Sequence, residues 1–247
     1  MAIFDIVEKF KSARNRLVFL DYDGTLVNLA QTPDKAIPTP ILLDALNNLS
    51  QQAHTKVIVI TGRTKKDIEN FLGNIELEII AEHGAAMKKN NNWICKIDDQ
   101  SIWKAEVIEL FNSITILLPG TFVEEKSSTV AWHYRSLEKD LEQKEELLQK
   151  LELLLIKYQL KVLDGNKVLE VMSKETGKGI AVRQIVSQNS YDFILAIGDD
   201  VTDEEMFQEL KNYENAYTIK VGEGETLAKQ KLSSPLEVLK LFNLFLS

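Results

Sequence analysis

The chain of 247 residues has only one cysteine, Cys95, so no disulfide can form within it. We therefore expect a protein of a reducing compartment, the cytoplasm. Cationic residues are also scarce, because 29 lysines and arginines stand against 37 acidic residues and give a net charge of −8. The chain thus lacks the basic excess typical of proteins that bind nucleic acids. Apolar runs such as LELLLI are far shorter than the roughly 20 residues of a membrane span, so we expect no membrane association.

Short apolar runs alternate with helical segments along most of the chain, a pattern typical of an α/β fold with a parallel sheet. Most of these runs are almost continuously apolar, as expected for strands that helices cover on both faces. Thr39, Thr64 and Thr202 have the spacing of helix N-caps. The predicted strands of this sheet are 17–20, 56–60, 78–80, 193–197 and 216–221.

The segment 89–166 has a different pattern, with fewer buried-strand signals and a long charged helix. We interpret it as an α+β domain inserted into a core formed by residues 1–88 and 167–247. Its predicted helices are 104–111 and 137–158, its predicted strands are 121–125 and 129–134, and a further strand pair is predicted at 160–163 and 167–171.

Polar residues follow three predicted core strands directly. They are Asp21 and Asp23 after the first, Thr61, Gly62 and Arg63 after the second, and Asp199, Asp200 and Asp203 after the fourth. The carboxyl ends of parallel strands meet at one sheet edge, so these side chains should gather there. Neighbouring carboxylates repel, so a proton or a cation must lie among them, and Mg²⁺ suits such ligands.

This set of residues indicates phosphoryl transfer. A carboxylate can act as a covalent nucleophile, and a second acid can protonate the leaving alcohol and then deprotonate water. Each residue alone has an ordinary alternative, since Asp also fills turns and Asp203 could serve only the first turn of a helix. Their joint occurrence at one sheet edge is what favours chemistry.

The stretches DYDGTL, ITGR, TGKG and IGDDVTDEE resemble, in this order, the four motifs of haloacid-dehalogenase-like (HAD) phosphohydrolases. The resemblance implies a Rossmann-like core with a parallel sheet and an inserted cap domain of the C2 type. It also implies a role for each matching residue: Asp21 as nucleophile and Mg²⁺ ligand, Asp23 as general acid/base and backbone metal ligand, Thr61 and Lys178 at the phosphate, Asp199 as metal ligand, and Asp200 and Asp203 as acids beside the metal ligands.

The phosphate-binding lysine has two candidates. MSKETGKG lacks the Arg-Pro or Lys-Pro that many single-domain relatives carry before this lysine, which leaves the loop path open. We favour Lys178 over Lys174, because Lys178 lies between glycines and directly precedes a helical run.

The inserted segment offers a second polar group in LPGTFVEEKSSTVAWHYR. On alternating strand geometry, Glu124 and Lys126 share one face, and so do His133 and Arg135. Donors and acceptors of both signs suit a ligand rich in hydroxyls. A solvated salt pair is the ordinary alternative for Glu124 and Lys126.

The pattern PG…EEK…WHYR, followed by GNKVLEV, resembles the cap of trehalose-6-phosphate phosphatases, especially those fused behind trehalose-phosphate synthases. By this resemblance Gly62 and Arg63 lie near the phosphate. The residues that would hold the sugar are Glu124, Lys126, His133, Arg135 and Glu170.

We therefore predict a Mg²⁺-dependent phosphatase that hydrolyses trehalose 6-phosphate through an aspartyl-phosphate. We expect a monomer whose partner is a small-molecule sugar phosphate. A phosphatase for sucrose phosphate or a glycosyl-glycerate phosphate is the nearest alternative. A phospho-receiver module is a further one, but a receiver needs neither Asp23 nor an inserted domain of this size.

Overall fold

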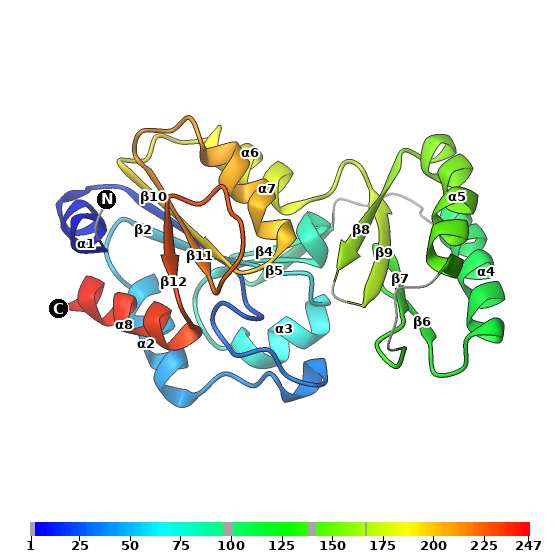
Figure 1. Cartoon of the computed structure of the whole chain (residues 1–247). Coiled ribbons are helices and arrows are strands. Elements are labelled where there is room, and N and C mark those ends of the chain that lie inside the picture. The colour runs from blue at the N-terminus through cyan, green and yellow to red at the C-terminus, as the bar shows by residue number, and fades with distance from the viewer. Residues whose placement is uncertain (1–2, 96–100, 138–141, 166) are drawn as a thin grey trace. The chain divides into compact units, whose positions relative to one another are not determined.

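The computed structural model describes residues 3–95, 101–137, 142–165 and 167–247, and the chain forms two compact units (Figure 1). We call Met1–Cys95 with Gly177–Ser247 the core domain, and Lys96–Thr176 the inserted domain. The fold class is α/β, as predicted.

The domain boundaries lie at 95/96 and 176/177, whereas the predicted ones were 88/89 and 166/167. Residue 166 lies outside the described residues. At the first boundary, β4 (Ala86–Lys89) and β5 (Asn92–Cys95) form an antiparallel hairpin that extends the core sheet. At the second, β9 (Val168–Ser173) pairs within the sheet of the inserted domain. Strand pairing therefore moves both boundaries toward the C-terminus.

The core sheet has eight strands in the order β12-β11-β10-β1-β2-β3-β4-β5. The strands from β12 to β3 run parallel, and β4 and β5 are antiparallel. All five predicted core strands are present. The remaining bounds are β1 (Arg16–Leu20), β2 (Thr55–Ile60), β3 (Glu78–Ala81), β10 (Phe193–Gly198), β11 (Ala216–Val221) and β12 (Gln230–Leu232).

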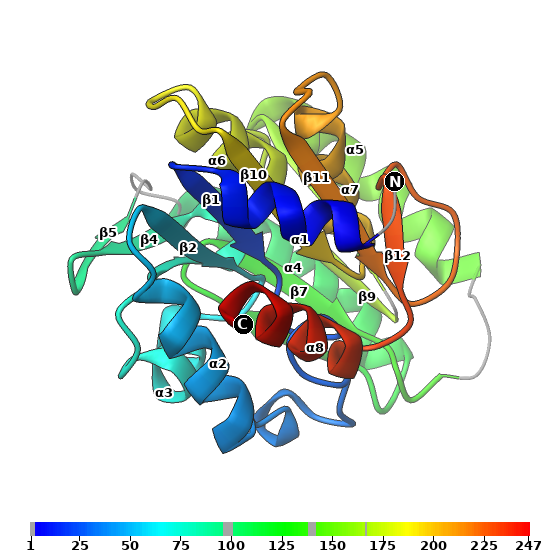
Figure 2. The same ribbon diagram turned by 90° about the vertical axis from the view of Figure 1, so that its left-hand side faces the viewer.

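Both faces of this sheet are covered, which explains its apolar strands. Along β1, Val18 and Leu20 pack into one apolar cluster, and Leu17 and Phe19 pack into another. The first cluster includes residues of α1, α2, α3 and α8, and the second those of α6 and α7. Figure 2 looks onto α1 and α8. The helices are α1 (Ile3–Ser12), α2 (Pro40–Ser50), α3 (Lys65–Leu72), α6 (Lys178–Val186), α7 (Val201–Leu210) and α8 (Pro235–Leu246), with short 3₁₀ helices η1 (Pro33–Lys35) and η2 (Glu82–Gly84).

Two of the predicted helix caps are confirmed and one is wrong. The Thr39 and Thr64 side chains accept hydrogen bonds from the backbone N–H of the third residue of α2 and of α3. The N-cap of α7 is Asp200, not Thr202, because the chain turns into the helix immediately after β10. Thr202 thus lies in the first turn of α7.

The inserted domain packs helices α4 (Ser101–Leu117) and α5 (Glu142–Lys157) with an antiparallel sheet. Its apolar core contains Phe111, Trp132 and Leu151. The predicted helix 137–158 falls partly on 138–141, outside the described residues. The sheet order is β6-β7-β9-β8, with β6 (Phe122–Glu125), β7 (Thr129–His133) and β8 (Leu160–Gly165). Among the described residues, no helix is both long and apolar enough for a membrane crossing.

Candidate active site

The site starts where β1 and β10 end side by side. Leu20 is in register with Ile197, and the backbone N–H of Asp21 donates to the Ile197 carbonyl at 2.9 Å. Gly24 turns the chain with φ +78°, and a Cβ there would lie 2.0 Å from Asp199 Oδ2. The turn after Asp21 therefore packs directly on Asp199, and only glycine leaves room for that carboxylate.

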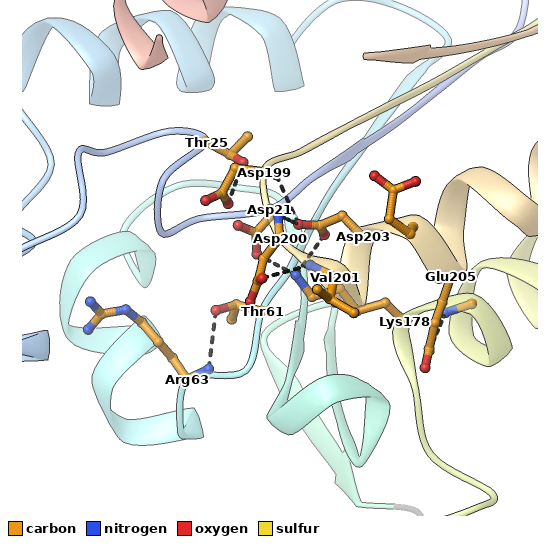
Figure 3. A network of polar contacts seen from close by, with 12 residues as sticks. Asp21, Thr25, Thr61, Arg63, Lys178, Asp199, Asp200, Val201, Asp203 and Glu205 are labelled. Carbon is orange, nitrogen blue, oxygen red and sulfur yellow. Dashed lines mark hydrogen bonds and ion pairs between the residues drawn. The ribbon is translucent and has the colours of Figure 1, made fainter. Parts of the chain in front are cut away.

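Three carboxylates and one ammonium converge at this edge (Figure 3). One oxygen each of Asp21, Asp199 and Asp203 lie within 4.8 Å of one another. The Lys178 ammonium donates to Asp21 Oδ1 at 2.6 Å and to Asp203 Oδ1 at 2.8 Å. Lys178 is 2% exposed and Asp203 is fully buried. The prediction that acidic side chains after separate strands meet at one sheet edge is thus confirmed for Asp21, Asp199 and Asp203.

Their electrostatics favour a cation. Burial raises the pKa of Asp21 well above its ordinary value, although Lys178 lowers it, and the charges of Asp203 and Asp199 raise it further. Burial, and then the charge of Asp203, raise the pKa of Asp199 to about 6. When ionised, three carboxylates against one ammonium leave a formal charge of −2. A bound divalent ion would cancel that charge, so the donor set fits a divalent metal.

Asp203 holds the loop after β10 in place. Its Oδ2 accepts from the backbone N–H groups of Asp199 and Asp200, both at 3.0 Å, while its Oδ1 accepts from Lys178. A Cβ on Gly198 would lie 2.2 Å from the Asp203 Cγ, so this approach requires glycine. Asp200 itself is exposed and accepts from the Val201 N–H at the start of α7.

Two residues beside Asp199 were not predicted. The Lys220 ammonium donates to the Asp199 carbonyl at 2.7 Å, and the Thr25 hydroxyl donates to Asp199 Oδ1 at 3.3 Å. A lysine at the carboxyl end of the apolar strand AYTIKV is the signal that could have found Lys220. Thr25 follows DYDG and carries no signal beyond that position.

The end of β2 contributes Thr61, Gly62 and Arg63. Thr61 is 1% exposed, and its hydroxyl accepts from the Arg63 N–H at 3.1 Å. A Cβ on Gly62 would meet the His83 ring at 2.4 Å. The Arg63 guanidinium donates through Nε and Nη2 to the two carboxylate oxygens of Asp23, each at 2.7 Å. Figure 3 shows this guanidinium directed away from Asp21 and Lys178.

The alternative lysine, Lys174, is exposed and lies in the inserted domain. Lys178 begins α6 directly after Gly177, which places its side chain among the carboxylates. Burial opposes the charge of Lys178, but Asp203 and Asp21 outweigh it and raise the pKa of the ammonium. The lysine is therefore charged at neutral pH.

The inserted domain brings together four of its five predicted residues in two pairs. His133 Nε2 lies 2.8 Å from Glu124 Oε2, and the Lys126 ammonium lies 2.9 Å from Glu170 Oε1. Ala131 of β7 pairs with Glu124 on one side and Glu170 on the other, so both carboxylates share one sheet face. The contact with His133 lowers the pKa of Glu124 against the effect of burial.

Arg135 follows β7 and is exposed. Lys104 of α4 was not predicted. Its buried ammonium donates to the carbonyls of Lys126 and Ser127, both at 2.6 Å, and so fixes the turn between β6 and β7. A lysine in a helix gives no sequence signal for this contact.

Known proteins are similar to this chain in sequence and in fold. The family model described as trehalose-phosphatase matches residues 19–238. The trehalose-phosphatase of Saccharomyces cerevisiae is 30% identical over 97% of the chain and 32% of its own length. The alpha,alpha-trehalose-phosphate synthase (UDP-forming) B of Dictyostelium discoideum is 36% identical over 97% of the chain and 31% of its own length. The chain thus spans about a third of these curated relatives.

Solved structures with a similar fold point to the same family. The C-terminal domain of the trehalose-6-phosphate phosphatase of C. albicans superposes with a TM-score of 0.89 at 30% identity, covering 100% of the chain and 97% of that structure. A haloacid dehalogenase-like hydrolase from B. subtilis shares the fold, with a TM-score of 0.69 at 15% identity over 92% and 98% of the two chains. The predicted resemblance is confirmed: the chain belongs to the trehalose-phosphatase family and has the HAD fold.

Proposed function

We propose that the chain hydrolyses trehalose 6-phosphate to trehalose and inorganic phosphate. The observation that carries this proposal is the buried lysine bridge between Asp21 and Asp203 beside Asp199, in a chain of the trehalose-phosphatase family. Such a cluster combines a carboxylate nucleophile with positive charge for phosphoryl oxygens.

The reaction would have two displacements. The Asp21 carboxylate attacks phosphorus, and the bond from phosphorus to the sugar oxygen breaks. That oxygen keeps the electron pair and takes a proton from Asp23. Water then attacks the aspartyl-phosphate and gives a proton to Asp23, and the Asp21 carboxylate leaves with its electron pair. One water is consumed, and both aspartates return to their starting state.

Positive charge at the site supports both displacements. Lys178 would orient Asp21 and offset the charge of the phosphoryl group, and the Thr61 hydroxyl would hold one of its oxygens. Asp21 and Asp199 would hold Mg²⁺ together with the backbone carbonyl of Asp23, and the ion when bound would offset further negative charge. Asp203 and Asp200 keep the loop that carries Asp199 in shape.

The inserted domain would select the sugar. The paired groups Glu124 with His133 and Lys126 with Glu170 present donors and acceptors on one small sheet. Both pairs are half-buried or buried, which favours recognition over a solvated salt pair. We include the exposed Arg135 in this proposal. Gly62 completes the proposed set beside Thr61 at the phosphate, whereas the Arg63 guanidinium pairs with Asp23.

Phosphate release from a panel of sugar phosphates tests the proposal. The protein, stripped of metal and then supplied with Mg²⁺, should hydrolyse trehalose 6-phosphate faster than sucrose 6-phosphate or glucose 6-phosphate. Turnover of trehalose 6-phosphate no faster than that of glucose 6-phosphate would refute the substrate. A stable phosphoprotein that releases no phosphate would instead indicate a receiver module.

A further inference from the structure

Arg63 and Asp23 form a two-point ion pair within the core domain. Arg63 Nε and Nη2 each lie 2.7 Å from a different oxygen of the Asp23 carboxylate. Arg63 is 8% exposed, whereas the Asp23 side chain is 34% exposed. A planar guanidinium that contacts both oxygens fixes the direction of the carboxylate as well as its distance.

The guanidinium is itself held from three directions. Its central carbon lies 5.1 Å from the centre of the Tyr22 ring and 5.1 Å from that of the Phe71 ring. The two rings are nearly parallel, with an angle of 8° between them. Arg63 Nη2 also donates to the Pro33 carbonyl at 2.8 Å. Cation–π contacts and a third hydrogen bond leave this guanidinium little freedom.

The Tyr22 ring is anchored in turn. Tyr22 is fully buried, and its hydroxyl donates to the Ala36 carbonyl at 2.9 Å. The chain therefore builds a rigid support that ends on one carboxylate, two residues after Asp21. A salt bridge needed only for stability gains little from such rigidity, because one of its partners is a third exposed.

We propose that Arg63 is a positioning residue for Asp23, holding its carboxylate in the orientation from which it exchanges protons with the substrate oxygen. This inference rests on the proposed function, in which Asp23 is the general acid and base. Proton transfer requires heavy atoms within hydrogen-bond reach, and displacement of a reacting group by about 1 Å can cost on the order of a hundredfold in rate.

The proposal differs from direct phosphate binding by Arg63. A phosphate-binding cation contacts the same phosphoryl group in every ester, so its loss should weaken all esters alike. Loss of a group that orients a proton donor should weaken an ester in proportion to how much its leaving oxygen needs that proton. Figure 3 favours the second role, because the guanidinium is directed away from Asp21.

A series of substituted phenyl phosphates separates the two roles. Its members have similar size, lack the sugar, and differ in the acidity of the leaving phenol. In the wild type, protonation by Asp23 should keep the dependence of kcat/KM on leaving-group acidity shallow. Arg63→Ala should steepen this dependence toward that of Asp23→Asn, with a loss for the least acidic phenol at least about tenfold larger than for para-nitrophenol.

A double variant tests whether Arg63 acts through Asp23. In the Asp23→Asn background, Arg63→Ala should change kcat/KM by no more than about twofold, since the group that it orients is gone. One control variant accompanies it. Arg183, on the surface, also donates through two nitrogens to one carboxylate, that of Glu209. Arg183→Ala should leave the dependence of kcat/KM on leaving-group acidity unchanged.

Milder variants keep the test valid if Arg63→Ala does not fold. Arg63→Lys keeps the charge but loses the two-point fork, and Phe71→Leu removes one ring from the support. Both should steepen the slope by less than Arg63→Ala. Melting curves identify variants that are folded.

Equal losses across the phenyl series, with the wild-type slope, would overturn the proposal, as would losses that multiply in the double variant. A different outcome would refute the proposed function. Hydrolysis of the phenyl series without hydrolysis of trehalose 6-phosphate would refute the sugar substrate, while the slopes would still decide the role of Arg63.

Discussion

Replacing Lys178 by methionine should destabilise the core domain more than the same change at any half-exposed lysine. Lys178 is 2% exposed and bridges Asp21 and Asp203, which are 5% and 0% exposed. Methionine fills similar volume but leaves both carboxylates buried with no ammonium between them. Removing one partner of a buried ion pair costs about 3–5 kcal/mol, a large part of a typical folding free energy of about 5–15 kcal/mol.

Lys88→Met is the matched control. Lys88 is also buried, at 5% exposure, and its ammonium lies 2.9 Å from Glu69 Oε1. The Glu69 side chain, however, is 44% exposed and can be solvated when the lysine is removed. We therefore expect a cost of about 1 kcal/mol or less from the lost ion pair. The difference between the two variants reports the burial of the acidic partners together with their number, two for Lys178 and one for Lys88.

Urea unfolding in the presence of a metal chelator measures both costs. The effect of Lys178→Met should also depend on pH, because burial and the charges of Asp203 and Asp199 already raise the pKa of Asp21, and the variant removes the ammonium that lowers it. A carboxyl whose folded-state pKa lies above its unfolded value loses stability as pH rises through the folded pKa. The variant should therefore be least stable, relative to the wild type, at alkaline pH. A cost no larger than that of Lys88→Met, or one independent of pH, would refute this reasoning.

Four further outcomes test the site. Asp21→Asn should abolish phosphate release and leave no phosphorylated protein detectable by mass spectrometry, and near-normal turnover would refute covalent catalysis there. Glu124→Ala should reduce kcat/KM for trehalose 6-phosphate at least about tenfold while sparing para-nitrophenyl phosphate, whereas Glu146→Ala on the surface of α5 should affect neither. Removal of metal should stop turnover, and Mg²⁺ should restore it. Calorimetric Mg²⁺ affinity should fall as pH drops below about 6, because burial raises the pKa of Asp199 to about 6 and a protonated carboxyl is a poor ligand; constant affinity across that range would contradict the metal assignment.

The strand-end rule was enough to bring Asp21 and Asp199 together, because parallel strands of continuous apolar sequence leave few alternatives. Lys178 required the family resemblance, since TGKG alone does not indicate where its side chain points. All three residues lie in the buried cluster at the sheet edge.

Other features could not be predicted from the sequence. β4 and β5 are only four residues long each, AMKK and NWIC, and lack the continuous apolar run of a buried strand, so the predicted boundary at 88/89 falls within β4. The pairing of Arg63 with Asp23 joins side chains 40 residues apart. It depends on rotamers that only the packed rings of Tyr22 and Phe71 determine.

The position of β10 next to β1 has a consequence for synthesis on the ribosome. β1 is translated before the inserted domain, yet its partner on one side, β10, is translated after that domain, with about 170 residues between the two strands. Until then, one edge of this apolar strand has no hydrogen-bonding neighbour and could pair with another nascent chain. Premature termination before Phe193 should therefore yield an aggregation-prone fragment rather than a weak enzyme, and the acidic cluster can assemble only after Asp203 has been translated.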